Sequence, residues 1–156
     1  MEQLDDALRS STPAEQQGLT PLFPVLVALP ALLGAAHHVD HIVRGNHVGW
    51  PIIPDVTPFT YSLVIYPVIA VGLYLTATDR AESRFWTGFF VFSTVMLWYF
   101  HLSPWAVEPP TDVILPYADP IVGYLAFGVL LALIVSVGFG TVYMGRLWLG
   151  GRSRGE

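Results

Sequence analysis

The sequence of 156 residues is 53% hydrophobic and 12% charged, with a mean hydropathy of +0.54. Soluble domains carry about 25% charged residues, so this composition is typical of a membrane protein. The chain has no cysteine, which excludes disulfides, thiolate metal sites and thiol catalysis. Its net charge of −5 and its lack of a basic cluster argue against nucleic acid as a partner.

Four stretches contain no Asp, Glu, Lys or Arg: residues 16–39, 56–78, 85–107 and 120–145. Each is long enough to cross a bilayer core of about 30 Å, which requires roughly 20 helical residues. A soluble helical core is the alternative, but its helices would need a charged face toward water, which these stretches lack. The sequence therefore predicts an all-α integral membrane protein with four transmembrane helices in an up-down bundle and the lipid bilayer around it.

The chain order of the expected units follows from these stretches. The region before the first apolar stretch is polar and net acidic, and we expect that stretch to be retained as a span because it is too long for a signal peptide. The expected units are an N-terminal tail (1–20), a transmembrane domain (21–145) with spans of about 21–41, 58–78, 85–103 and 120–145, and a short basic C-terminal tail (146–156).

The distribution of arginine predicts the orientation. Six of the seven arginines fall on one side of the expected spans, and only Arg44 falls on the other. Because positive residues are retained in the cytoplasm, we expect both termini there, in a multi-pass protein of a prokaryotic cell membrane. Trp50, Trp86, Trp105 and Trp148 fall near expected span ends, where amphipathic rings favour the headgroup region.

Four of the five histidines lie between His37 and His47, where the first apolar stretch ends. His37 and His41 are four residues apart, so a helix would place them on one face. His101 lies near the outer end of the third expected span and so reaches the same level. This face also gathers several carboxylates: Asp40, Asp55, Glu108, Asp112 and Asp119.

Neutral imidazoles and carboxylates are the ligands of zinc, copper and iron. We expect His37, His41 and His101 to bind a divalent transition metal directly. An aspartate would be a fourth ligand or would accept the second ring N–H of a ligating histidine. The candidate metal residues are His37, His38, Asp40, His41, His101 and Asp119.

Several other functions remain open for these histidines. Haem ligation is a variant of the metal hypothesis, in which His37 or His38 would pair with His101 across a bundle. The cluster could instead form structural hydrogen bonds, handle protons, or supply acid–base catalysis to a membrane enzyme acting on a lipid-soluble substrate. Residue 38 is a second histidine rather than the glutamate of HExxH metalloproteases, so that motif is absent.

Two further features of the sequence are a stripe of small residues that could pack against another helix and a loop that could cover the histidines. Gly128, Ala132, Ser136 and Gly140 form a stripe that would let another helix approach closely, either within the bundle or in a homo-oligomer or partner complex. This stripe is also the candidate working surface of a purely structural or assembly protein. The connection 44–62 is rich in proline and glycine, and we expect a stiff loop that could cover the histidines.

Overall fold

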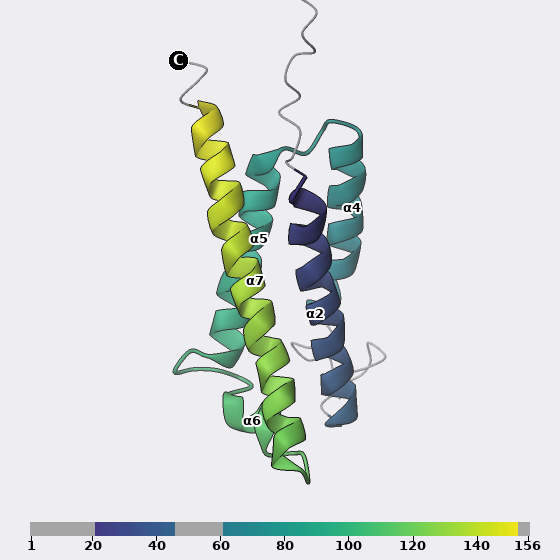
Figure 1. Cartoon of the computed structure of the whole chain (residues 1–156), viewed down its shortest axis with the longest axis vertical. Coiled ribbons are helices and arrows are strands. Elements are labelled where there is room, and N and C mark those ends of the chain that lie inside the picture. Colours follow the sequence, from purple (N-terminus) through teal and green to yellow (C-terminus); the bar gives the residue numbers. More distant parts are fainter. Residues whose placement is uncertain (1–20, 46–60, 153–156) are drawn as a thin grey trace, which may run out of the picture.

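The computed structural model describes residues 21–45 and 61–152, and within these residues all regular structure is helical. The all-α prediction is therefore confirmed for this part of the chain. The longer helices lie along one axis in alternating directions, with α6 and the start of α7 at the end opposite the α4–α5 connection (Figure 1). The helices are α2 (Phe23–Val43), α4 (Ile65–Ala77), α5 (Ser83–His101), α6 (Pro110–Ile114) and α7 (Pro120–Arg152).

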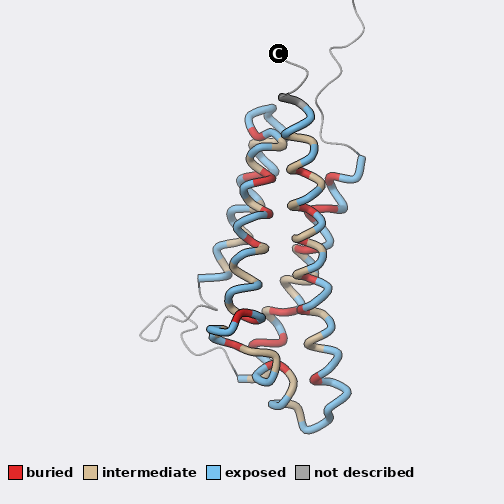
Figure 2. Tube along the Cα trace, turned by 90° about the vertical axis from the view of Figure 1, so that its left-hand side faces the viewer, coloured by how far each residue is buried: buried red, intermediate tan, exposed pale blue. Residues whose placement is uncertain are grey.

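The apolar core lies where α2, α5 and α7 meet. Trp86 and Phe90 of α5 are fully buried and pack with Val137 and Met144 of α7. Phe23 of α2 meets the Trp86 ring edge to face, with ring centroids 5.0 Å apart. Outside this core, exposed residues extend along the full length of the helices (Figure 2).

Trp86 corrects one expectation. It falls near a predicted span end, where an indole should face the headgroups, but the structure buries it completely. A buried indole N–H needs an acceptor, and Trp86 Nε1 donates to Thr76 Oγ1 of α4 at 2.9 Å. This hydrogen bond ties α4 to α5. Trp105 is 72% exposed, as the expectation requires.

The small-residue stripe of α7 divides between packing and open surface. A Cβ at Gly140 would lie 2.8 Å from the Phe90 ring, so this glycine is what lets α7 approach α5. A Cβ at Gly128 would meet nothing within 4 Å, and Ala132 is exposed. The use of this surface by a partner stays a prediction.

The helix bounds agree best where the pattern is uninterrupted. The helices α2 and α5 begin and end within two residues of the predicted spans 21–41 and 85–103. The last helix continues past the expected end at Gly145 to Arg152, so the predicted C-terminal tail begins inside a helix.

The second predicted span begins at residue 58, but the described helix α4 begins at Ile65. Pro67 has no N–H to donate to the Leu63 carbonyl, which would be its partner in a continuous α-helix. The Tyr66 N–H reaches that carbonyl instead, at 3.3 Å, in a tighter turn. Residues 58–60 lie outside the described part of the chain.

Two of the described helices, α2 and α7, are long and apolar enough to cross a membrane. The 13 residues of α4 span roughly 20 Å, less than a bilayer core. The 19 residues of α5 are enough in length, but its Trp, Tyr, Ser and Thr residues make it less hydrophobic. The structure therefore identifies two membrane-spanning candidates rather than the four predicted.

Candidate metal centre

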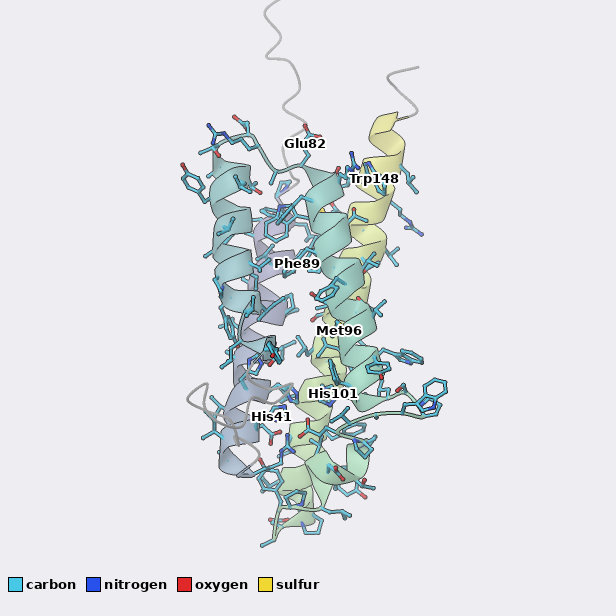
Figure 3. All side chains as sticks on the ribbon, turned by 180° about the vertical axis from the view of Figure 1, so that it is seen from behind. His41, Glu82, Phe89, Met96, His101 and Trp148 are labelled. Carbon is cyan, nitrogen blue, oxygen red and sulfur yellow. The ribbon has the colours of Figure 1, made fainter. Side chains whose placement is uncertain are left out.

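Three histidines meet where α2 and α5 end. His37 and His41 lie one turn apart on α2, with ring centroids separated by 4.6 Å. His101 is the last residue of α5, and its ring centroid lies 5.0 Å from that of His37. Because α2 and α5 run in the same direction, with α4 returning between them in the chain, their C-terminal residues His41 and His101 lie at the same end of the molecule, opposite Glu82 (Figure 3).

Glu108 joins these histidines from the connection after α5. The connection folds back on the helix, because the Glu108 N–H donates to the Phe100 carbonyl at 3.0 Å. His101 Nδ1 in turn donates to the Glu108 backbone carbonyl at 3.2 Å. These two hydrogen bonds carry the Glu108 side chain under the end of α5 and toward α2.

The four side chains form a buried cluster. His37, His41, His101 and Glu108 are each 4–7% exposed, and one ligand atom from each lies within 4.8 Å of the others. His41 Nε2 is 3.1 Å from His37 Nε2 and 3.2 Å from Glu108 Oε2. Glu108 Oε2 is 3.4 Å from His101 Nδ1. Three nitrogen-bearing rings and one carboxylate thus converge on one small volume.

Convergence of this kind suits a shared cation. Two neutral imidazole nitrogens that face each other can share only one hydrogen, whereas both can direct a lone pair at a metal ion. His37 Nδ1 is also buried with no hydrogen-bond partner among the described residues, and the nearest carboxylate oxygen is Asp40 Oδ2 at 4.0 Å. This buried ring nitrogen therefore has no hydrogen bond among the described residues, which is rare for a polar group in a protein interior.

Arg44 lies beside the cluster and contacts two carboxylates, that of Glu108 in the cluster and that of the neighbouring Asp40. Its Nε donates to Asp40 Oδ2 at 2.8 Å, a contact that their i,i+4 spacing at the end of α2 favours. Its Nη1 donates to Glu108 Oε1 at 2.7 Å and to the Asp112 carbonyl at 2.8 Å. The Arg44 side chain is 2% exposed, so this is a buried ion-pair network and not a surface pair.

Tyr117, between α6 and α7, completes the network by donating its hydroxyl hydrogen to Asp40 Oδ1. Burial and the hydrogen bond to the Asp40 carboxylate raise the pKa of Tyr117 to about 12. The phenol therefore stays protonated at neutral pH and remains a donor. Both oxygens of Asp40 are thus engaged, one by Tyr117 and the other by Arg44.

The structure separates the six predicted residues into two groups. His37, His41 and His101 lie in the cluster, and Asp40 lies behind His37. His38 faces α4, where its Nδ1 is 2.6 Å from the Tyr66 hydroxyl. Asp119, the remaining predicted residue, is exposed. Its Oδ1 accepts a hydrogen bond from the backbone N–H of Ile121 at 2.9 Å and so caps the start of α7.

Sequence reasoning missed Glu108 as a ligand candidate, together with the contacts of Arg44 with Glu108 and of Tyr117 with Asp40. Glu108 lies seven residues after His101, in a connection without helical periodicity. The available signal was its position as the first charge after the third apolar stretch, on the same side as the histidines. The loop expected to cover the site, including His47, lies largely outside the described residues.

Comparisons with known proteins do not assign the chain to a family. No protein-family model, no curated protein and no solved structure matches it. The chemistry of the centre is therefore inferred from its residues and their geometry alone.

Proposed function

We propose that this chain is a four-span helical membrane protein that holds one divalent transition-metal ion at its extracytoplasmic end. The observation that carries the proposal is the buried set His37, His41, His101 and Glu108, whose ligand atoms lie within 4.8 Å of one another. Burial of three imidazoles and a carboxylate is costly unless hydrogen bonds or an ion compensate them. A metal ion would satisfy all four at once.

The apolar outer surface supports the membrane part of the proposal. Only 28% of the apolar stretch of α2 and 22% of that of α7 is buried inside the chain. Large side chains such as Leu32, Phe92 and Val135 are 62–70% exposed at mid-helix positions. An apolar surface of this extent is stable in lipid, where α4 and α5 would complete the bundle with α2 and α7.

The donor set favours zinc among the divalent ions. A tetrahedral zinc ion with bonds of about 2.0–2.1 Å has ligand atoms about 3.3–3.4 Å apart. The separations of 3.1 Å between His37 Nε2 and His41 Nε2 and of 3.2 Å between His41 Nε2 and Glu108 Oε2 are close to that spacing. Four protein ligands fill a tetrahedral site, which is typical of zinc that holds a structure together.

The ring geometry favours a bare ion over haem. Bis-imidazole ligation places the porphyrin plane between two histidine rings. The rings of His37 and His101 meet edge to face with centroids 5.0 Å apart, which leaves no room for a macrocycle between them. His38 is turned away toward Tyr66 and Ser62 of the segment that leads into α4.

Metal analysis of the detergent-purified chain tests the metal part. We expect about one zinc per chain after exposure to Zn²⁺ and desalting, and loss of that zinc in His37→Ala and His101→Ala. His38→Ala is the matched control, because His38 is next in sequence but lies outside the cluster. A chain that retains no metal, or a control that loses metal as fully as His101→Ala, would contradict the proposal.

Cysteine labelling tests the membrane part. Because the chain has no cysteine, single cysteines at Glu82 and Thr111 report on the two ends without background. In intact cells, a membrane-impermeant maleimide should label Thr111→Cys at once, and Glu82→Cys only after permeabilisation. Equal labelling of both positions would contradict a bundle that spans the membrane with its centre outside.

A further inference from the structure

Arg44 occupies an unusual position for a charged side chain. It is 2% exposed and lies between two buried carboxylates, contacting Asp40 through Nε and Glu108 through Nη1. The guanidinium presents its donors in a rigid planar fork, so fixing one contact orients the other. Asp40 and Glu108 come from segments far apart in the sequence, and Arg44 holds them in one arrangement.

The contact with Arg44 gives the two oxygens of the Glu108 carboxylate different partners. Its Oε1 accepts from Arg44 at 2.7 Å. Its Oε2 faces the rings, 3.2 Å from His41 and 3.4 Å from His101. With Oε1 engaged, the carboxylate offers the cluster a single oxygen in a fixed direction.

Asp40 is placed behind the opposite side of the cluster. Arg44 and Tyr117 engage its two oxygens, and Oδ2 lies 4.0 Å from His37 Nδ1. Metal-ligating histidines commonly direct the second ring nitrogen at a carboxylate, which fixes the tautomer and the ring orientation. A shift of about 1 Å would bring this pair into hydrogen-bond range.

We infer that Arg44 is a positioning residue of the metal centre, which orients Glu108 as a one-oxygen ligand and sets Asp40 behind His37. The inference rests on the proposed metal function and adds to it a residue that does not touch the ion. It predicts a sign. A guanidinium that acted only as a nearby positive charge would repel a divalent cation, so its removal would tighten binding; a positioning residue, when removed, weakens binding.

The test is a set of metal titrations on the full chain in detergent. Zinc affinity is measured by competition with a chromophoric chelator, and Co²⁺ absorption reports the ligand geometry. Arg44→Gln removes the charge and the fork, and Arg44→Lys keeps the charge but cannot bridge both carboxylates as a rigid fork. Arg80→Gln, on the exposed α4–α5 connection, removes one positive charge far from the centre and is the control.

We expect both Arg44 variants to bind one ion about 10- to 100-fold more weakly, with an altered Co²⁺ spectrum, and Arg80→Gln to match the unaltered chain. Tighter binding by Arg44→Gln, or unchanged binding by Arg44→Lys, would overturn the positioning role. If Arg44→Gln does not fold by circular dichroism, Asp40→Asn decides the question. It should weaken binding about tenfold, and unchanged affinity would overturn the inference.

The outcomes separate this inference from the proposed function. If the unaltered chain binds neither Zn²⁺ nor Co²⁺, the metal function fails and the inference fails with it. If the unaltered chain binds one ion but Arg44→Gln and Arg44→Lys bind equally well, the metal function stands and only the positioning role is lost.

Discussion

The same three helices build two halves of opposite character. In the half near the α4–α5 connection, Phe23, Trp86 and Phe90 fill an apolar core with residues of α7. In the other half, α2 and α5 bury His37, His41 and His101 against the Glu108 carboxylate. The difference shows what burial requires, since apolar side chains need only good packing, whereas buried polar groups need specific partners.

In the apolar half, truncating a buried aromatic ring should cause the largest loss of stability. Phe90→Ala should lower the free energy of unfolding by about 3–5 kcal/mol, because it leaves a cavity beside Trp86 and Gly140. Zinc stoichiometry should stay unchanged in the folded fraction, since Phe90 does not contact the centre. Denaturant unfolding followed by circular dichroism measures the effect.

Phe92→Ala is the matched control for this prediction. Phe92 is on the same helix but is 62% exposed, so its truncation leaves no internal cavity. An equal loss of stability in Phe90→Ala and Phe92→Ala would show that the core is not where the structure places it.

The polar half should be stabilised by its ion. Zinc at about 100 times its dissociation constant should add about 2.7 kcal/mol to the stability of the unaltered chain and of His38→Ala. Glu108→Gln should lose most of this gain, because an amide oxygen is a weaker ligand than a carboxylate. Thermal unfolding with and without zinc measures the difference.

Tyr117 should give the smallest of these effects. Tyr117→Phe removes the hydroxyl donor to Asp40 and should cost about 1.5 kcal/mol. The pKa of Tyr117 is raised to about 12, so its contribution is complete below about pH 10 and is lost as the pH rises toward 12. The unaltered chain should lose more stability than Tyr117→Phe between pH 9 and pH 12, and parallel curves would contradict this role.

The fold was predictable where apolar patterns were continuous. The predicted spans 21–41 and 85–103 placed α2 and α5 within two residues, because each helix follows an uninterrupted apolar run. The start of α4 was not predictable to this precision. It depends on a local detail, in which Pro67 has no N–H to donate and the Tyr66 N–H bonds to the Leu63 carbonyl instead. The burial of Trp86 was missed, since it depends on an acceptor, Thr76, on another helix.

The site was predictable in the part that lies on helices. The i,i+4 spacing brings His37 and His41 together, and the shared direction of α2 and α5 brings His101, at the end of α5, to their level. Glu108 is held by an irregular connection whose path follows from hydrogen bonds to Phe100 and His101. No sequence periodicity describes such a path, and its ligand role required the three-dimensional structure.

X-ray absorption on the zinc-loaded chain tests the central claim most directly, because it measures the ligands around the ion itself. We predict four nitrogen or oxygen ligands at about 2.0–2.1 Å, with outer scattering from three imidazole rings. The His101→Ala variant, loaded at high zinc, should show scattering from one ring fewer. A spectrum of zinc surrounded by water oxygens, with no imidazole scattering, would show that the cluster does not hold the metal.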